Sequence, residues 1–464
     1  MMGIWLLMPK IRSRLLVALT LLLLVSDINA QRSAIDTYAI TNARIVTVSG
    51  PVIERGTVVI RNGLITAAGA NVNAPPDARV IDGTGLTVYP GLIDSYTDLA
   101  LPAPAPAPSP SPGGGGGGFF ALTAPRPASG PNSTQPPGLQ PEVRVEEVIR
   151  PGGTEIEASR NIGITTALTS PRSGIWMGQS ALINLAGDTP QQMIVRSPVA
   201  MHVSFTPLRS GTYPGSLMGV FSTLRQMMLD AQRYRDSLQI YERAPRGTRR
   251  PDTDRSLEAL VPVIEGRMPV VMLANSEREI TRALDLATEF KLRLIIAGGR
   301  EADRVTDRLA KQNVPVLLSL NLPRRTTAAL PEADPEPMRV LRERVEAQQT
   351  AGKLAKAGVR FAFQSGDLRD ISDLMVNAGR VIENGLTATD ALRAFTIWPA
   401  EILGVQNQLG SIEAGKIANL TVTRGDLFDR NTRVTHVFID GRPVEIKPAR
   451  DSSTTGISPT ATPN

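Results

Sequence analysis

The sequence lacks cysteine altogether and contains only two histidines, His202 and His436. The absence of cysteine excludes disulfide bonds, zinc–thiolate sites and thiol nucleophiles together. Lysine is also scarce, since none occurs between Lys10 and Lys291, and nearly all of the positive charge therefore comes from arginine. The chain has few residues from which a site built on imidazoles or on an activated lysine could be assembled.

The charge and the length of the chain limit which kinds of protein it can be. Fifty Lys and Arg residues are interspersed with 44 Asp and Glu residues, and the net charge is +6. No basic run carries interleaved aromatic residues, so nucleic acid is not an expected partner. A chain of 464 residues, 42% hydrophobic, exceeds the roughly 250–300 residues of a single core. We expect one large domain and an accessory domain.

The first thirty residues have the pattern of a signal peptide. Three basic residues precede an apolar run over residues 15–25, and Ala30 offers a small side chain at the cleavage point. The run is shorter than the roughly 20 residues that a spanning helix needs. We expect an exported protein, periplasmic or extracellular, with no stable membrane anchor after cleavage. An uncleaved anchor is the alternative interpretation.

Residues 38–87 predict short β-strands, and from residue 155 the pattern changes to alternating strands and helices. Asn62-Gly63 between two apolar runs is a strong hairpin signal. Ser276 and Glu279 have capping-box spacing at the start of a helix. The alternation is typical of parallel βα units and gives about six parallel strands. These come from seven predicted strand ranges: 164–168, 180–185, 199–205, 269–273, 292–297, 314–320 and 359–363.

Residues 100–141 interrupt this pattern with Pro-Ala and Pro-Ser repeats and six consecutive glycines. Such a composition cannot bury enough apolar surface to offset its ordering entropy, so we expect an extended, disordered insertion. It is either a solvated insertion without a role or a lid or docking arm, with Phe119-Phe120 as its apolar contact. The tail over residues 448–464 is expected to be disordered as well.

Three motifs resemble those of the amidohydrolase superfamily. The sequence V-Y-P-G-L-I-D-S-Y-T-D over residues 88–98 resembles its first barrel strand, P-G-L-I-D-x-H-x-H. Residues 385–404 and the G-S-I-E-A-G-K-I-A-N-L-T-V stretch over 410–422 resemble two further family motifs, with Asn419 where Asp is usual. The resemblance covers residues 38–447 and is nearest to the imidazolonepropionase-like and prolidase-like branch.

The resemblance implies an α/β fold, a TIM-like (β/α)8 barrel carrying a split β-sandwich. The barrel would occupy residues 88–404. Residues 31–87 and 405–447 would form the two parts of the sandwich, so the two ends of the chain should meet in one sheet.

The resemblance also implies a metal site whose ligands this chain lacks. Family members hold zinc through two histidines of strand one, a lysine or glutamate of strand four, one histidine each of strands five and six, and an aspartate of strand eight. Tyr96 and Asp98 stand at the two strand-one positions, and Leu273 stands at strand five. Asp367, or its neighbour Gly366, aligns with the strand-eight aspartate. No zinc or other cofactor is expected.

The remaining candidates give two hypotheses. His202 lies on a predicted barrel strand and is either a core residue or part of a pocket, whereas His436 lies in the closing hairpin and is expected to be structural. We predict a vestigial pocket lined by Tyr96, Asp98, His202, Leu273 and Asp367.

The leading hypothesis is an exported, non-catalytic amidohydrolase-family protein. It would bind a ligand, or associate with an active homologue or with itself. The alternative is a hydrolase of carbon–nitrogen bonds, non-peptide or dipeptide, with a rebuilt site that uses the carboxylates of Asp98 and Asp367.

Overall fold

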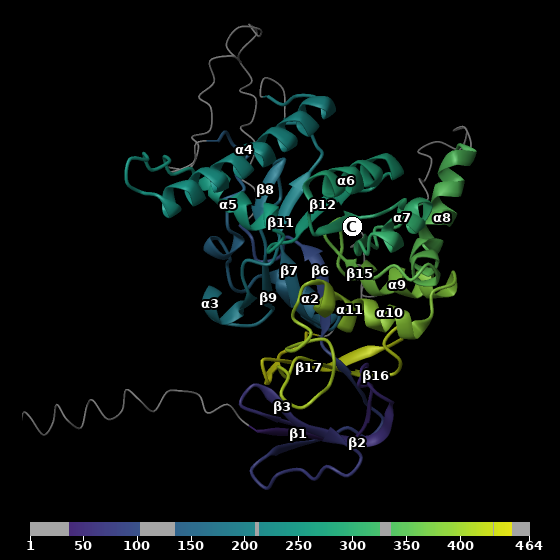
Figure 1. Cartoon of the computed structure of the whole chain (residues 1–464). Helices are drawn as coiled ribbons and strands as arrows, with labels where there is room; N and C mark the ends of the chain where they lie inside the picture. Colours follow the sequence, from purple (N-terminus) through teal and green to yellow (C-terminus); the bar gives the residue numbers. More distant parts are fainter. Residues whose placement is uncertain (1–36, 103–134, 209–212, 325–335, 430, 448–464) are drawn as a thin grey trace, which may run out of the picture.

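The computed structural model describes residues 37–102, 135–208, 213–324, 336–429 and 431–447. The expected signal peptide, residues 103–134 of the expected insertion and the tail lie outside these ranges. Figure 1 shows a β-rich unit below a larger unit of mixed strands and helices. Within the described ranges, no helix is both long and apolar enough to cross a membrane.

The β-rich unit is one eight-stranded sheet that takes strands from both ends of the chain. Its order is β18-β17-β16-β5-β1-β2-β3, and β4 pairs with β1. β16 runs antiparallel to β5 and places Val422 opposite Val88. The strands are β1 (Tyr38–Ile45), β2 (Ile53–Arg61), β3 (Leu64–Gly69), β4 (Arg79–Asp82), β5 (Thr87–Pro90), β16 (Leu420–Arg424), β17 (Arg433–Ile439) and β18 (Arg442–Val444).

The inward side chains of this sheet share one core. Val58 and Val422, more than 360 positions apart, are both fully or almost fully buried in the same apolar cluster. Asn62 and Gly63 join β2 to β3 with φ angles of 53° and 79°, the left-handed conformation that a tight hairpin needs. The predicted meeting of the chain ends and the predicted hairpin are both present.

Asn419, the family's usual aspartate position, connects the β-rich unit to the larger one. Its Nδ2 donates to Asn184 Oδ1 at 2.7 Å and to Thr166 Oγ1 at 2.9 Å. Its Oδ1 accepts from the Asp440 backbone N–H at 2.8 Å. The amide is 5% exposed, so these three hydrogen bonds satisfy a buried polar group at the junction of the units.

The strands of the larger unit form two sheets. The four-stranded sheet has the order β10-β9-β7-β6, and the six-stranded sheet has the order β15-β14-β13-β12-β11-β8. The strands are β6 (Leu92–Thr97), β7 (Ile164–Thr169), β8 (Trp176–Gln179), β9 (Ala181–Asn184), β10 (Ile194–Arg196), β11 (Met201–Ser204), β12 (Val270–Ala274), β13 (Leu294–Gly298), β14 (Val316–Ser319) and β15 (Phe361–Gln364).

β6 and β7 are parallel, as are the five strands from β11 to β15. The interpretation of residues 180–185 as another parallel strand is wrong, because β9 runs antiparallel to β7 and β8 runs antiparallel to β11. Residues 176–184 thus form one bent segment that pairs with both sheets. The two sheets also meet at β6 and β15, where the Gly366 N–H donates to Tyr96 O at 3.0 Å.

Helices cover the outer faces of these strands (Figure 1). The predicted capping box is present: Ser276 Oγ accepts from the Glu279 N–H, and the Glu279 carboxylate accepts from the Ser276 N–H at 3.0 Å. The helices are α2 (Thr154–Asn161), α3 (Pro190–Met193), α4 (Leu217–Arg243), α5 (Arg255–Ile264), α6 (Glu277–Phe290), α7 (Thr306–Lys311), α8 (Met338–Lys356), α9 (Asp373–Glu383), α10 (Ala388–Phe395) and α11 (Ile397–Ile402), with the short 3-10 helices η2 (Val145–Glu147) and η3 (Ala302–Val305).

The end of the expected insertion is packed rather than exposed. Leu139 is 5% exposed and forms an isolated β-bridge with Trp176. The Ile175 N–H donates to Gly138 O at 2.7 Å. The expectation of disorder up to residue 141 is therefore wrong for residues 135–141, because Leu139 supplies an apolar contact and the backbone pairs with the start of β8.

Candidate functional site

Asp94, in the first half of β6, is a buried carboxylate that contacts Ser365, the residue that follows β15. It is fully buried and accepts hydrogen bonds from the Ser365 N–H at 3.0 Å, from Ser365 Oγ, and from the Tyr96 N–H at 3.3 Å. Burial raises the pKa of Asp94 to about 6, although these hydrogen bonds oppose the shift. The sequence analysis assigned Asp94 no role. The available signal was a carboxylate that directly follows Leu92-Ile93 in a strand.

Tyr96 follows on the same strand and is nearly buried, with 8% of its surface exposed. Burial raises the pKa of its phenol to about 12. A hydrogen bond with the Ser170 side chain opposes this, and the negative charges of Asp367 and Asp98 add to it. Tyr96 is therefore a neutral phenol across the physiological pH range, and a neutral phenol is a poor ligand for a divalent metal ion.

His202 lies on β11 beside Tyr96, with the two ring centroids 5.6 Å apart and an interplanar angle of 40°. It is fully buried, and neither of its ring nitrogens has a hydrogen-bond partner among the described residues. Burial lowers the pKa of His202 to about 3. The imidazole is thus neutral and, unlike a metal-ligating histidine, has no partner that would fix its tautomer.

Leu273 lies on β12, where the register places it beside Ser204 of β11 and Ala297 of β13. It packs against the same apolar cluster that contains Tyr96. Side chains from seven strands contribute to this cluster: Ile93, Leu168, Leu182, Val271, Ile295, Leu317 and Ala362. The space between the strands is therefore filled by apolar side chains at these levels.

The two carboxylate candidates lie at the edge of this region. Asp98 forms an ion pair with Arg172 Nε, and Arg172 Nη1 also donates to Pro102 O at 2.6 Å. Asp367 is exposed, and its backbone carbonyl accepts from Asn321 Nδ2 at 2.9 Å. Both charges act on the Tyr96 phenol. The charge of Asp98 is, however, already compensated by an arginine.

His436 lies far from this region, on β17 of the β-rich unit, opposite Val422 of β16. Its Nδ1 is 3.2 Å from Thr435 Oγ1, and partial burial lowers its pKa. Its surroundings are those of a side chain on a sheet face, in agreement with the structural role that the sequence predicted.

The residues at the family's metal positions do not fit a zinc ion. Tyr96 is a neutral phenol, Asp98 is paired with Arg172, and Leu273 has no donor atom. Over the described part of the chain, no three His, Cys, Asp or Glu side chains are grouped closely enough to hold a metal ion. A catalytic zinc site needs three protein ligands and an open position for water.

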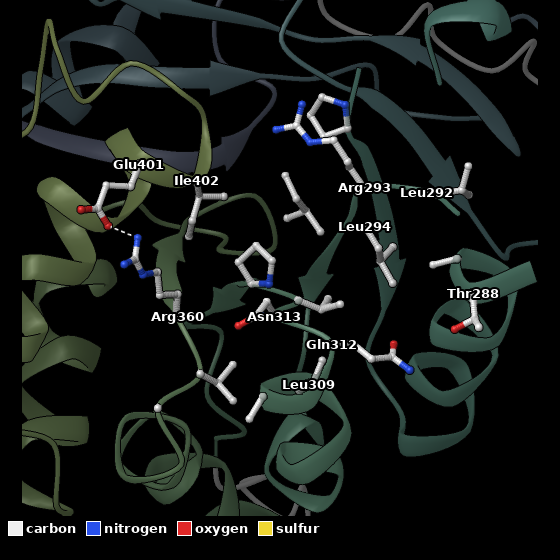
Figure 2. Close-up of a pocket in the computed structure, with 18 residues that line it drawn as sticks. Thr288, Leu292, Arg293, Leu294, Leu309, Gln312, Asn313, Arg360, Glu401 and Ile402 are labelled. Atoms are coloured by element: carbon white, nitrogen blue, oxygen red, sulfur yellow. Dashed lines mark hydrogen bonds and ion pairs between the residues drawn. The ribbon is translucent and has the colours of Figure 1, made fainter. Parts of the chain in front are cut away.

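Two cavities of similar volume lie away from Tyr96 and His202. One, of about 890 Å³, opens at the amino ends of β12 to β15 (Figure 2). The other, of about 900 Å³, lies beside α5 and is lined by residues that include Glu142, Arg196 and Arg255. The sequence analysis missed both, because their walls come from segments distant along the chain.

Comparison with known proteins finds similarity to amidohydrolases. Residues 336–444 match the amidohydrolase family model. The amidohydrolase from Thermotoga maritima MSB8 superposes with a TM-score of 0.71 at 25% sequence identity, over 88% of this chain and 100% of that one. A Xaa-Pro dipeptidase solved with bound methionine gives 0.52 at 14%, over 88% and 100%. A prolidase complexed with N-methylphosphonate-L-proline gives 0.50 at 18%, over 89% and 100%. The last two show likeness of fold alone.

Proposed function

Because this chain is a member of the amidohydrolase superfamily, we propose that it is a non-catalytic member, which keeps the scaffold without the metal-dependent hydrolytic site. The observation that carries this proposal is the packing of Tyr96 against His202. A neutral phenol and a neutral imidazole without a partner occupy the interior, where catalysis would need metal ligands and room for a water molecule.

We infer further that the two sheets of the larger unit are the wall of one TIM-like barrel. The bent segment over residues 176–184 pairs with β7 through β9 and with β11 through β8. At the opposite seam the Gly366 N–H donates to Tyr96 O, and Ser95 Oγ donates to Phe363 O at 2.7 Å. In a barrel of this class the functional mouth lies at the carboxyl ends of the strands, where Tyr96 and Asp98 are found.

The role we propose is binding or partnership outside the cytoplasm. The basic and apolar pattern of residues 1–30 supports export. A non-catalytic scaffold can bind a ligand, or it can associate with an active homologue or with a second copy of itself. The same exported location suits each of these roles.

Metal analysis of the purified full chain tests the proposal. We expect well below one equivalent of zinc, manganese or nickel after dialysis, and no hydrolysis of dipeptides or N-acyl amino acids when each metal is added back. About one or two equivalents of tightly bound transition metal, or metal-dependent hydrolysis, would overturn it.

The alternative hypothesis, a carboxylate-based hydrolase, predicts a different result. Two variants distinguish the two hypotheses. Hydrolysis that Asp98→Asn and Asp367→Asn each abolish, while the exposed control Asp252→Asn retains it, would establish the alternative. Asp252 is suited to this control because it lies in an exposed ion pair with Arg249. Under our proposal, the wild type and all three variants are equally inactive.

A further inference from the structure

The cavity at the amino ends of β12 to β15 lies at the opposite end of these strands from Tyr96. Its wall is built from the residues that enter the strands, among them Pro269, Leu294, Pro315 and Arg360, and from α11 through Ile402. Figure 2 shows Arg293 and the Arg360–Glu401 pair on different sides of this space. A volume of about 890 Å³ is within the range of small-molecule sites, about 300–1,000 Å³.

The cavity is lined by more basic than acidic side chains. Arg293 and Arg360 are its two basic residues, and Glu401 is its one acidic residue. Glu401 forms an ion pair with Arg360. Arg293 has no carboxylate partner in the described part of the chain and donates only one long hydrogen bond, from Nη1 to Arg267 O at 3.4 Å. One guanidinium is therefore left with most of its donors available.

Most of the remaining lining residues are apolar, although polar and apolar atoms contribute about equally to the surface of the cavity. Leu294, Ile295 and Val359 are each at most 5% exposed and form its inner wall. Thr288, Gln312 and Asn313 add neutral polar groups to the lining, and Figure 2 shows them spread from the centre of the view to its right side. An apolar wall with a few convergent polar groups and one unpaired arginine is suited to a ligand that has an apolar body and one negative charge.

We propose that this cavity binds a small monocarboxylate that carries an apolar group, with the carboxylate on Arg293 and the apolar group against Leu294, Ile295 and Val359. A guanidinium presents parallel N–H donors that match the two oxygens of a carboxylate, so the match is geometric as well as electrostatic. The site is separate from the proposed loss of the metal centre and does not depend on it.

Titration calorimetry on the full chain tests the proposal with four probes: butyrate, octanoate, octylamine and octanol. We expect saturable one-to-one binding of octanoate, with affinity falling roughly three- to fourfold for each methylene removed toward butyrate. Octylamine and octanol should bind at least tenfold more weakly, because neither offers an anion to Arg293.

Two variants assign the binding to this cavity. Arg293→Gln should weaken octanoate binding about tenfold or more, and Arg293→Lys should weaken it less, because the charge remains while the two-pronged geometry is lost. Arg278→Gln is the matched control, since Arg278 is an exposed arginine of α6 that does not line the cavity. Its affinity for octanoate should equal that of the wild type.

The proposal is overturned if octanoate does not bind saturably, if octylamine binds as tightly as octanoate, or if Arg293→Gln leaves the affinity unchanged. An equal loss in Arg278→Gln would also overturn it, because the charge effect would then be general. Melting curves of each variant confirm that the compared proteins are folded. If Arg293→Gln does not fold, the octanoate affinity of Arg293→Lys is compared with that of the wild type instead.

Discussion

The ring of Tyr96 packs against the imidazole of His202, with centroids 5.6 Å apart. The two residues come from strands β6 and β11, and both are buried between the sheets. Tyr96 stands at the first histidine of the family's H-x-H pattern, so a residue that would ligate a metal is replaced by one that fills space. This contact places the Tyr96 ring in an apolar cluster.

Replacing His202 by leucine should raise the free energy of unfolding by about 1–3 kcal/mol. Both ring nitrogens lack partners, and a buried polar group without a hydrogen bond is destabilising by about this amount. Urea denaturation measures the difference, and His436→Leu on the half-buried face of β17 should stay within about 0.5 kcal/mol of the wild type. A loss of stability in His202→Leu would mean that a buried water satisfies the imidazole.

The advantage of His202→Leu over the wild type should grow as the pH falls from about 6.5 toward 4. The folded pKa of His202 is about 3, below its ordinary 6.5. The unfolded chain therefore binds a proton in this window while the folded chain does not, which destabilises the wild type at lower pH. Chemical denaturation at pH 7, 6, 5 and 4 measures this trend, and a pH-independent difference would contradict it.

Asp94→Asn should show the opposite dependence on pH. The folded pKa of Asp94 is about 6, above its ordinary 3.8, so the folded wild type binds more protons between these values. Its stabilising contribution is present below pH 3.8 and is lost as the pH rises through 6. Relative to the wild type, Asp94→Asn should therefore gain stability from pH 4 to pH 6. Parallel stability curves over this range would show that Asp94 titrates normally.

Asn419→Ala should lower the free energy of unfolding by about 3 kcal/mol. The change removes three hydrogen bonds at a buried junction and leaves the Asp440 N–H and Asn184 Oδ1 without this partner. Asn407→Ala is the control, because Asn407 is an exposed asparagine on the nearby loop after α11. Equal melting temperatures for the two variants would show that Asn419 does not hold the units together.

The double variant Tyr96→His with Asp98→His should restore the H-x-H pattern without restoring stoichiometric zinc. The two new imidazoles are fewer than the three protein ligands of a catalytic zinc site, and we expect native His202, whose ring packs against position 96, to stay in this core contact and not turn a nitrogen toward them. Adding Leu273→His, which supplies a third imidazole from β12, should allow about one equivalent of zinc to remain after dialysis. Elemental analysis of both variants measures this. Zinc held tightly by the double variant would reveal an additional native ligand.

Local patterns predicted much of the fold because the forces involved act over a few residues. Asn62-Gly63 determined a hairpin through backbone conformation, and Ser276 with Glu279 determined a helix start through reciprocal hydrogen bonds. The direction of β8 and β9 could not be predicted in this way. An apolar run has the same sequence pattern in a parallel and in an antiparallel strand. Its direction depends on the strands that pair with it.

The sequence by itself determined that the family's metal site cannot be assembled in its usual form, since two histidines in the whole chain are too few. Only the tertiary structure decided which side chains surround Tyr96. Tyr96 and His202 are more than 100 residues apart, and no periodicity relates them. No periodicity relates Arg293 to the Arg360–Glu401 pair either, although all three line the cavity at the amino ends of β12 to β15. Contacts between distant segments depend on how the strands are ordered and packed, and this packing placed a neutral pair in the interior and an unpaired arginine at the opposite end.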